Sequence, residues 1–119
     1  MPKTIQTLRQ RAFQHQGGTC CYCSAPMWQR SPEELPCKPP SLRAAKQLQC
    51  TAEHLLARSD GGGHTEKNIA AACTRCNHGR HKRRRPLGPS EFRGHVLRRM
   101  ETGRWHAEWV HAQAHAQGA

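Results

Sequence analysis

Two pairs of cysteines in this 119-residue chain have the spacing of a metal site. Cys20 and Cys23 form one Cys-x-x-Cys pair, and Cys73 and Cys76 form another. A two-residue gap lets both sulfurs of a pair reach one tetrahedral ion, and two pairs complete a structural zinc site with no position left for a substrate. We therefore predict a structural Zn²⁺ ion. A Cys21-x-Cys23 pair is the competing register, although a one-residue gap is less usual for zinc.

A second group of polar residues lies near the second cysteine pair. Glu53 and His54 occur in the stretch "CTAEH", and Asn77 directly follows the last cysteine of that pair. On a helix, His81 would share a face with Asn77, because residues i and i+4 are neighbours. A carboxylate, an amide oxygen and an optional imidazole form an incomplete shell that suits Mg²⁺, Mn²⁺ or a similar divalent ion and leaves positions for water and phosphate.

His54 would lie beside that ion without having to bind it. A neutral imidazole, with a reference pKa of about 6.5, can take a proton from water at physiological pH. Adjacent residues of a regular strand point to opposite faces of a sheet. Glu53 and His54 can therefore serve one site only if the strand ends or bulges there, and the stretch "SDGGG" that follows is compatible with this condition.

Together these residues resemble the HNH endonuclease family, which has the ββα-metal fold. The family pattern of Cys-x-x-Cys, Asp-His, a Gly-Gly loop, an Asn and a second Cys-x-x-Cys appears here as "CCYC", "AEHLLARSDGGGHTEKNIAAAC" and "CTRCNHGRH". The resemblance covers residues 20–85. It implies an α+β fold, with a small ββα-metal (HNH, or His-Me finger) core stapled by a four-cysteine zinc site and flanked by N- and C-terminal helices.

The resemblance also implies a role for each polar residue. His54 corresponds to the general base, while Glu53, in place of the usual Asp, and Asn77, in place of the more common His, correspond to ligands of the catalytic metal. Asn68 corresponds to the middle Asn, which in the family holds the loop and orients the base. His81 resembles a second helix ligand of the colicin-type members, which other members do without.

These roles imply metal-dependent hydrolysis of a DNA phosphodiester. His54 would deprotonate the attacking water, and one divalent ion, Mg²⁺ or another such as Mn²⁺ or Ni²⁺, would offset the charge that develops on the phosphate and on the leaving oxygen. Two other interpretations stay open: a zinc-stapled module that binds DNA without cutting it, and a nuclease directed at RNA. The DNA-binding module explains the cysteines, but gives no reason for the spacing of His54, Asn68 and Asn77.

The chain is strongly basic, which indicates a polyanionic partner. Nineteen Lys and Arg residues face eight Asp and Glu residues, for a formal net charge of +11. We predict contact with the phosphate backbone of duplex DNA, centred on the run "RHKRRR". The expected contact residues are Arg58, Arg80, Lys82, Arg83, Arg84 and Arg85. Backbone contacts position a protein but read no sequence, so base specificity stays open, as does the choice between monomer and homodimer.

The remaining sequence predicts the elements that position these groups within a single domain of residues 1–119. Helices are expected from apolar spacing and stop signals at residues 4–16, 77–85 and 90–102. A strand is expected in "LQCTAEHLL", and the proline-rich insert at residues 29–41 predicts an irregular loop that does not build the site. Trp105 and Trp109 are expected to pack against the domain, while the last ten residues are expected to fray.

The sequence also bears on the cellular setting. No apolar stretch approaches the ~18 residues of a membrane span, and "MPKTIQTLRQ" lacks the apolar core of a secretory signal. We therefore expect a cytoplasmic protein, in a bacterial or phage-infected cell. Thiols stay reduced in that compartment, which favours zinc over disulfides as the use of these cysteines.

Overall fold

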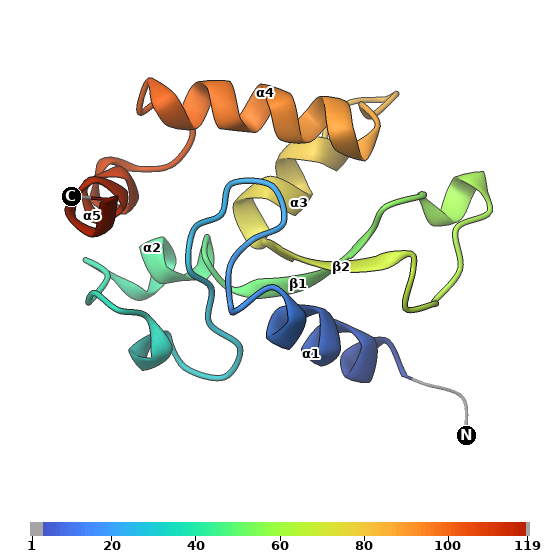
Figure 1. Ribbon diagram of the computed structural model, residues 1–119, viewed down its shortest axis with the longest axis horizontal. Coiled ribbons are helices and arrows are strands. Elements are labelled where there is room, and N and C mark those ends of the chain that lie inside the picture. The colour runs from blue at the N-terminus through green and yellow to red at the C-terminus, as the bar shows by residue number, and fades with distance from the viewer. Residues whose placement is uncertain (1–3, 119) are drawn as a thin grey trace.

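The computed structural model describes the backbone of residues 4–118 and the side chains of residues 4–113. Its elements, in chain order, are α1 (Ile5–His15), the 3₁₀ turn η1 (Pro32–Glu34), α2 (Leu42–Lys46), β1 (Cys50–His54), the 3₁₀ turn η2 (Arg58–Asp60), β2 (Ile69–Cys73), α3 (Thr74–His81), α4 (Pro89–Glu101) and α5 (Glu108–Gly118) (Figure 1). The combination of helices with a two-stranded antiparallel sheet confirms the predicted α+β fold class.

The strands β1 and β2 form a hairpin that leads directly into α3. Cys50 lies opposite Cys73, and His54 lies opposite Ile69. Helix α1 lies on one side of the strands and α3 on the other (Figure 1). The side chain of Cys73 caps α3 by accepting a hydrogen bond from the backbone N–H of Cys76. The chain therefore has a ββα unit in which the end of β2 fixes the start of the helix.

Side chains cover both edges of this sheet. On β2, the side-chain amide of Gln16 donates to the carbonyl oxygen of Ala71 and accepts from its N–H, as a neighbouring strand would. On β1, Nδ2 of Asn77 donates to the carbonyl oxygen of Ala52. Residues at these non-hydrogen-bonded positions of an antiparallel pair point their backbone groups outward, so the side chains satisfy groups that the partner strand does not reach.

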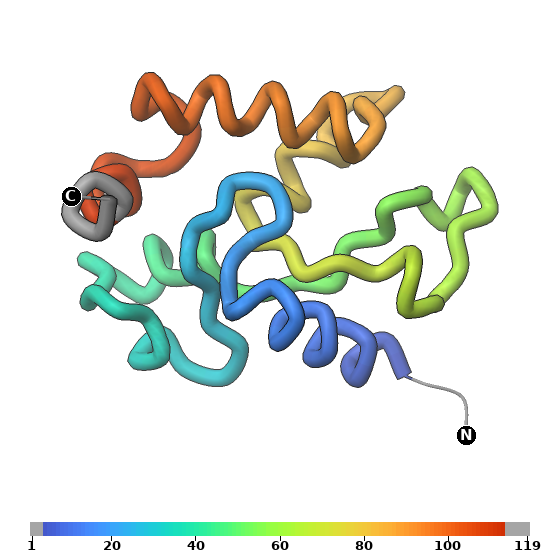
Figure 2. Tube along the Cα trace, in the orientation of Figure 1, coloured from blue at the N-terminus to red at the C-terminus, as the bar shows by residue number. Residues whose placement is uncertain are grey.

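The first cysteine pair lies in a tight turn that follows α1. Gly17 and Gly18 end the helix with φ angles of 66° and 77°, a left-handed conformation that glycine adopts without steric cost. The backbone N–H of Cys21 then donates to the carbonyl oxygen of Ala71 in β2. The turn and the β2–α3 junction are therefore side by side although they are far apart in the chain (Figure 2).

The C-terminal part of the chain packs back onto this unit. Trp105 is buried in the hydrophobic core with Phe92 of α4. Trp109 is partly buried and packs against the same core, as expected. Helix α5 runs through residues 108–118, where fraying was predicted, and residue 119 lies outside the described residues. Burial of Val110 explains the difference, because tertiary packing supplies most of the stability of a short helix.

Helix α3 begins and ends earlier than predicted. It covers Thr74–His81, where the sequence indicated residues 77–85. Nε of Arg80 donates to the carbonyl oxygen of Leu87, which folds the segment after His81 back against the helix. The residue before Pro86 is also disfavoured in a helical conformation. Most of the basic run therefore lies beyond the helix.

The other long elements lie close to their predicted positions. Helices α1 and α4 differ by one residue at each end from the predicted ranges, and the proline-rich insert is irregular apart from η1. None of the helices within residues 4–118 is long and apolar enough to cross a membrane.

Candidate metal centres and nucleic-acid surface

The sulfurs of the four predicted zinc ligands converge. The Sγ atoms of Cys20, Cys23, Cys73 and Cys76 all lie within 4.8 Å of one another, and all four residues are buried. The sulfurs of Cys23 and Cys73 are 3.9 Å apart. A tetrahedron with metal–sulfur bonds of about 2.3 Å has edges of about 3.8 Å. The cluster is therefore compatible with a zinc site in the Cys20–Cys23 register, and Cys21 lies outside it.

Backbone N–H groups support two of these sulfurs. The N–H groups of Tyr22 and Cys73 donate to the sulfur of Cys20, at 3.4 and 3.3 Å. The N–H of Cys76 donates to the sulfur of Cys73 at 3.4 Å. Hydrogen bonds of this kind favour the thiolate, and they are typical of the groups that surround metal ligands.

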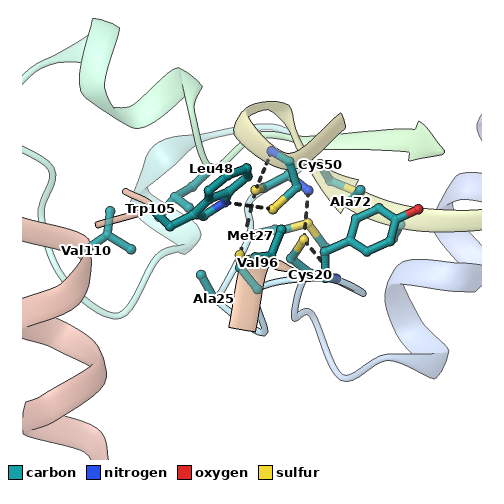
Figure 3. Packing of buried hydrophobic residues seen from close by; sticks show 14 of the residues in the cluster. Cys20, Ala25, Met27, Leu48, Cys50, Ala72, Val96, Trp105 and Val110 are labelled. Atoms are coloured by element: carbon teal, nitrogen blue, oxygen red, sulfur yellow. Dashed lines mark hydrogen bonds between the residues drawn. The ribbon is translucent and has the colours of Figure 1, made fainter. Parts of the chain in front are cut away.

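The other two sulfurs receive donors from the segment after α4. Nε1 of Trp105 donates to the sulfur of Cys76 at 3.2 Å (Figure 3). Nε2 of His106 lies 3.2 Å from the sulfur of Cys23, as a donor in its Nε2–H tautomer. The backbone N–H groups of Trp105 and His106 both donate to Nε2 of His111 in α5. Sequence reasoning missed His106, since no spacing relates it to the cysteines.

These contacts shift the pKa of the first cysteine pair. Hydrogen bonds from the neighbouring thiols, that of Cys21 first, hold the pKa of Cys20 well below its usual value. For Cys23, Cys20 acts to raise the pKa, but bonds from the second cysteine pair and from His106 outweigh it and lower the pKa to about 6. The pKa values of Cys73 and Cys76 are shifted upward instead, first by their hydrogen bonds with Cys20 and Cys23. The first pair therefore reaches the thiolate form, which is the form that binds a metal ion, more readily than the second pair.

A second site forms where β1 ends beside α3. The strand ends at His54, directly after Glu53. The side chain of Glu53 is 1% exposed, and its Oε1 lies 2.8 Å from Nε2 of His81, whose side chain is 32% exposed. One oxygen and one nitrogen that suit the same ion are therefore adjacent, and the imidazole is open to solvent.

Asn77 lies one turn before His81 on the same face of α3. Its Nδ2 donates to Oγ1 of Thr51 at 3.0 Å and to the carbonyl oxygen of Ala52 at 3.2 Å. These bonds tie the first turn of the helix to β1. The amide oxygen of Asn77 is therefore the atom that a metal ion could use.

Two buried polar atoms at this site have no hydrogen-bond partner among the described residues. They are Oε2 of Glu53 and Nε2 of His54. Buried polar atoms in proteins are nearly always hydrogen-bonded, so the imidazole nitrogen of His54 indicates a place for water. Oε2 of Glu53 accepts no hydrogen bond from the described residues and is held by an ion pair of 3.3 Å with Nη1 of Arg80. The donor set of Glu53, Asn77 and His81 fits a divalent ion of the Mg²⁺ or Mn²⁺ type.

The surroundings of His54 favour its neutral form. Its ring centroid lies 5.0 Å from that of His64 in the following loop. Burial lowers the pKa of His54, and the charges of His64 and Arg58 lower it further, while Glu53 acts in the opposite direction. The net shift is downward, so the imidazole stays uncharged to a lower pH than usual.

Asn68 holds the loop that follows His54. Its Oδ1 accepts from the N–H of Leu56 at 2.7 Å, and its Nδ2 donates to the carbonyl oxygens of Leu56 and Gly63, both at 3.0 Å. Within the same loop, a Cβ atom on Gly62 would lie 1.7 Å from the carbonyl oxygen of Leu56. A glycine is therefore required at that position.

Arg80 lies inside the protein, which corrects its predicted place on the nucleic-acid surface. It is 5% exposed, and Nη1 lies 3.3 Å from Oε2 of Glu53 in an ion pair. Its guanidinium also donates to the carbonyl oxygens of His54 and Leu55 and to the hydroxyl of Tyr22. These carbonyl and hydroxyl oxygens are buried and need hydrogen-bond donors. Nothing in the sequence distinguishes Arg80, which supplies the donors, from the other cations of the basic run.

The other predicted contact residues are exposed. This group consists of Arg58, Lys82, Arg83, Arg84 and Arg85. Within the described part of the chain, none of them pairs with a carboxylate. Arg58 follows β1 in the chain, while the other four follow α3.

The two antiparallel strands, helix α3 and the four-cysteine cluster are together compatible with a small ββα fold. Residues 37–83 match the HNH endonuclease family, which confirms the predicted resemblance and implies a nuclease-type function. The match includes the second cysteine pair and the Glu53–His81 site, and it begins after the first cysteine pair. No curated protein and no solved structure matches the chain.

Proposed function

We propose that the protein is a metal-dependent endonuclease that hydrolyses DNA phosphodiester bonds, with His54 as its general base. The main support is the buried and unpartnered Nε2 of His54, next in the chain to a carboxylate that contacts His81. An uncharged imidazole nitrogen without a partner is suited to accept a proton from water.

Glu53, Asn77 and His81 are the proposed ligands of a divalent ion such as Mg²⁺, Mn²⁺ or Ni²⁺. When bound, such an ion would offset the negative charge that develops on the phosphate and on the leaving oxygen. Arg80 orients the Glu53 carboxylate through its contact of 3.3 Å with Oε2. Asn68 orients His54 indirectly, because it holds the loop into which β1 continues.

The proposed substrate is duplex DNA, bound through its phosphate backbone. The exposed cations at position 58 and at positions 82–85 support this choice, together with the net charge of +11. Binding that depends on phosphate contacts weakens steeply as salt is added. Reduced cysteines around a zinc ion would suit the cytoplasm of a bacterial or phage-infected cell.

Nicking of supercoiled plasmid tests this function. The wild-type protein should nick with Mg²⁺, Mn²⁺ or Ni²⁺ and not after chelation, and His54→Ala should lose at least about 100-fold in rate with its zinc content and thermal unfolding unchanged. His78→Ala is the matched control, because His78 is an exposed histidine on α3. Structured RNA as a second substrate separates a DNA enzyme from an RNA enzyme.

One result would replace the catalytic proposal. If wild type and His54→Ala both bind duplex DNA equally and neither cuts it with any of the three metals, the protein is a zinc-stapled DNA-binding module. Cleavage that persists in His54→Ala would instead remove His54 from the role of base.

A further inference from the structure

Helix α3 has a second face, opposite to that of Asn77 and His81. Arg75 and Gly79 lie four residues apart on this face of α3, and Lys82 and Arg83 continue the stripe just beyond the end of the helix. This stripe and α4 enclose a groove of about 190 Å³. Asn77 and His81 lie on the side of α3 that faces β1, so the groove lies on the other side of the helix from the proposed catalytic site. Arg80 lines the groove, while its Nη1 pairs with Glu53.

The groove combines positive charge with aromatic rings. Its lining includes Arg75, Lys82, Arg83, Phe92, His95 and Trp105. No carboxylate of the described residues lines it. Burial first, and then the charges of Arg99, Arg83 and Arg98, lower the pKa of His95. Positive charge therefore gathers around the groove without an acidic group to neutralise it.

Arg75 is held in one orientation within the groove. Its guanidinium carbon lies 4.2 Å from the centroid of the Trp105 ring, and its Nε donates to the carbonyl oxygen of Trp105 at 3.2 Å. A Cβ atom on Gly79 would lie 3.1 Å from Cη2 of Trp105, so glycine permits this close approach. A guanidinium that is stacked before the ligand arrives loses little freedom on binding, and its remaining N–H groups suit a phosphate.

We propose that this groove binds a backbone phosphate of the nucleic acid other than the one that is cleaved, with Arg75 as its main contact. The proposal rests on the proposed function, because it extends the path of the same substrate. The two faces of a helix are about 10–12 Å apart, a distance that the backbone of one strand spans within a few nucleotides. A strand that crosses the C-terminal end of α3 would then occupy both sites.

Trp105 also links the groove to the cysteine cluster. The ring that stacks on Arg75 donates its Nε1 proton to the sulfur of Cys76. The position of Arg75 therefore depends on a residue that is anchored at the cluster. Removal of the indole N–H and removal of the Arg75 guanidinium should disturb the same contact with the phosphate. The losses in DNA affinity that they cause should therefore not be additive.

Fluorescence anisotropy of a short labelled duplex tests the proposal in the full chain carrying His54→Ala. In this background, Arg75→Gln should weaken binding about tenfold and should lower the slope of log affinity against log salt by about 1. Arg75→Lys keeps the charge and should show an intermediate loss, because it cannot stack and bond at once. Trp105→Phe should weaken binding, and the double variant with Arg75→Gln should bind no more weakly than Arg75→Gln alone.

Arg43→Gln is the control for total charge, since Arg43 is an exposed cation on α2 outside the groove lining. It should bind as the parent does. Equal losses of DNA affinity in Arg43→Gln and Arg75→Gln would contradict phosphate binding in the groove. So would a folded, zinc-loaded Arg75→Gln variant that binds DNA as tightly as the parent. A parent that binds structured RNA in place of DNA, with the same loss in Arg75→Gln, supports it. A parent that binds neither overturns it, while the nicking assay reports separately on catalysis.

Discussion

The two candidate metal centres of this protein are built in opposite ways. At the cysteine cluster, all four sulfurs are buried and each has an N–H partner. At the end of β1, Nε2 of His54 is buried without a partner among the described residues, Oε2 of Glu53 has an ion pair but no hydrogen bond, and the His81 side chain is 32% exposed. A closed shell with satisfied surroundings stabilises a fold, whereas an open one leaves positions for water and substrate.

Both centres use the eight-residue helix α3. The first turn of α3 supplies Cys76 to the closed centre, and the last turn supplies His81 to the open centre. The cluster therefore fixes the helix on which two of the proposed catalytic ligands, Asn77 and His81, lie. Changes to the closed centre should act first on stability, and changes to the open centre should act first on chemistry.

The largest effect is expected from Cys76→Ser. Structural zinc contributes about 10–16 kcal/mol to small zinc domains, which is comparable to the whole stability of a typical domain. The variant should lose bound zinc and its cooperative thermal transition, as followed by elemental analysis and circular dichroism. Cys37→Ser is the control, because Cys37 is exposed and outside the cluster. A zinc-free variant that still unfolds cooperatively would contradict the stabilising role.

Arg80→Ala should come next, with a loss of about 3–5 kcal/mol in the free energy of unfolding. The change leaves the carboxylate of Glu53 buried without its guanidinium partner and removes donors from the carbonyl oxygens of His54 and Leu55. Urea denaturation measures the loss. Arg84→Ala, which removes an exposed cation, should change the free energy by less than about 0.5 kcal/mol. Similar values for the two variants would refute the buried role of Arg80.

His106→Phe should weaken zinc binding without unfolding the protein. It removes the N–H that lies 3.2 Å from the sulfur of Cys23, and loss of such a supporting group typically costs 10–100-fold in metal affinity, so we expect a decrease of about that size. Competition with a chromophoric chelator measures it. Trp109→Phe is the control, because Trp109 is a partly buried aromatic residue that packs against the hydrophobic core but donates to none of the sulfurs in the described structure. Unchanged affinity would show that His106 only fills space.

The smallest expected effect is on the pH dependence of cleavage. A base must be neutral to accept a proton, so activity should fall as pH decreases through the pKa of His54. Burial and neighbouring positive charges place that pKa below its usual 6.5, and the acid midpoint of kcat/KM should lie below that value. A rate profile in the presence of Mg²⁺ measures it. A midpoint above pH 7 would assign the titration to another group.

The residues whose roles depend on local spacing were predictable from the sequence. The two Cys-x-x-Cys pairs indicated one cluster, because the spacing within each pair sets how two sulfurs can meet one ion. The strand ends at His54, as the condition on Glu53 and His54 required. The ββα arrangement followed from the same motifs through the resemblance.

The roles that depend on distant contacts were not predictable. Arg80 lies in a run of cations, and its burial follows from unpaired groups that only the folded chain brings to it. His106 reaches the cluster because His111 orients the turn before α5. Neither residue stands at a spacing that marks it, and α5 itself depends on packing that its sequence does not reveal.

The covered sheet edges have a consequence for association between copies of the chain. An exposed strand edge offers unpaired N–H and C=O groups to any other extended chain, and it is a common starting point for aggregation. Here the Gln16 amide is hydrogen-bonded to the N–H and C=O groups of Ala71 on β2, and the Asn77 amide is hydrogen-bonded to the C=O group of Ala52 on β1. A third strand from another molecule would have to displace these side chains first, so the small sheet is protected against growth by strand addition.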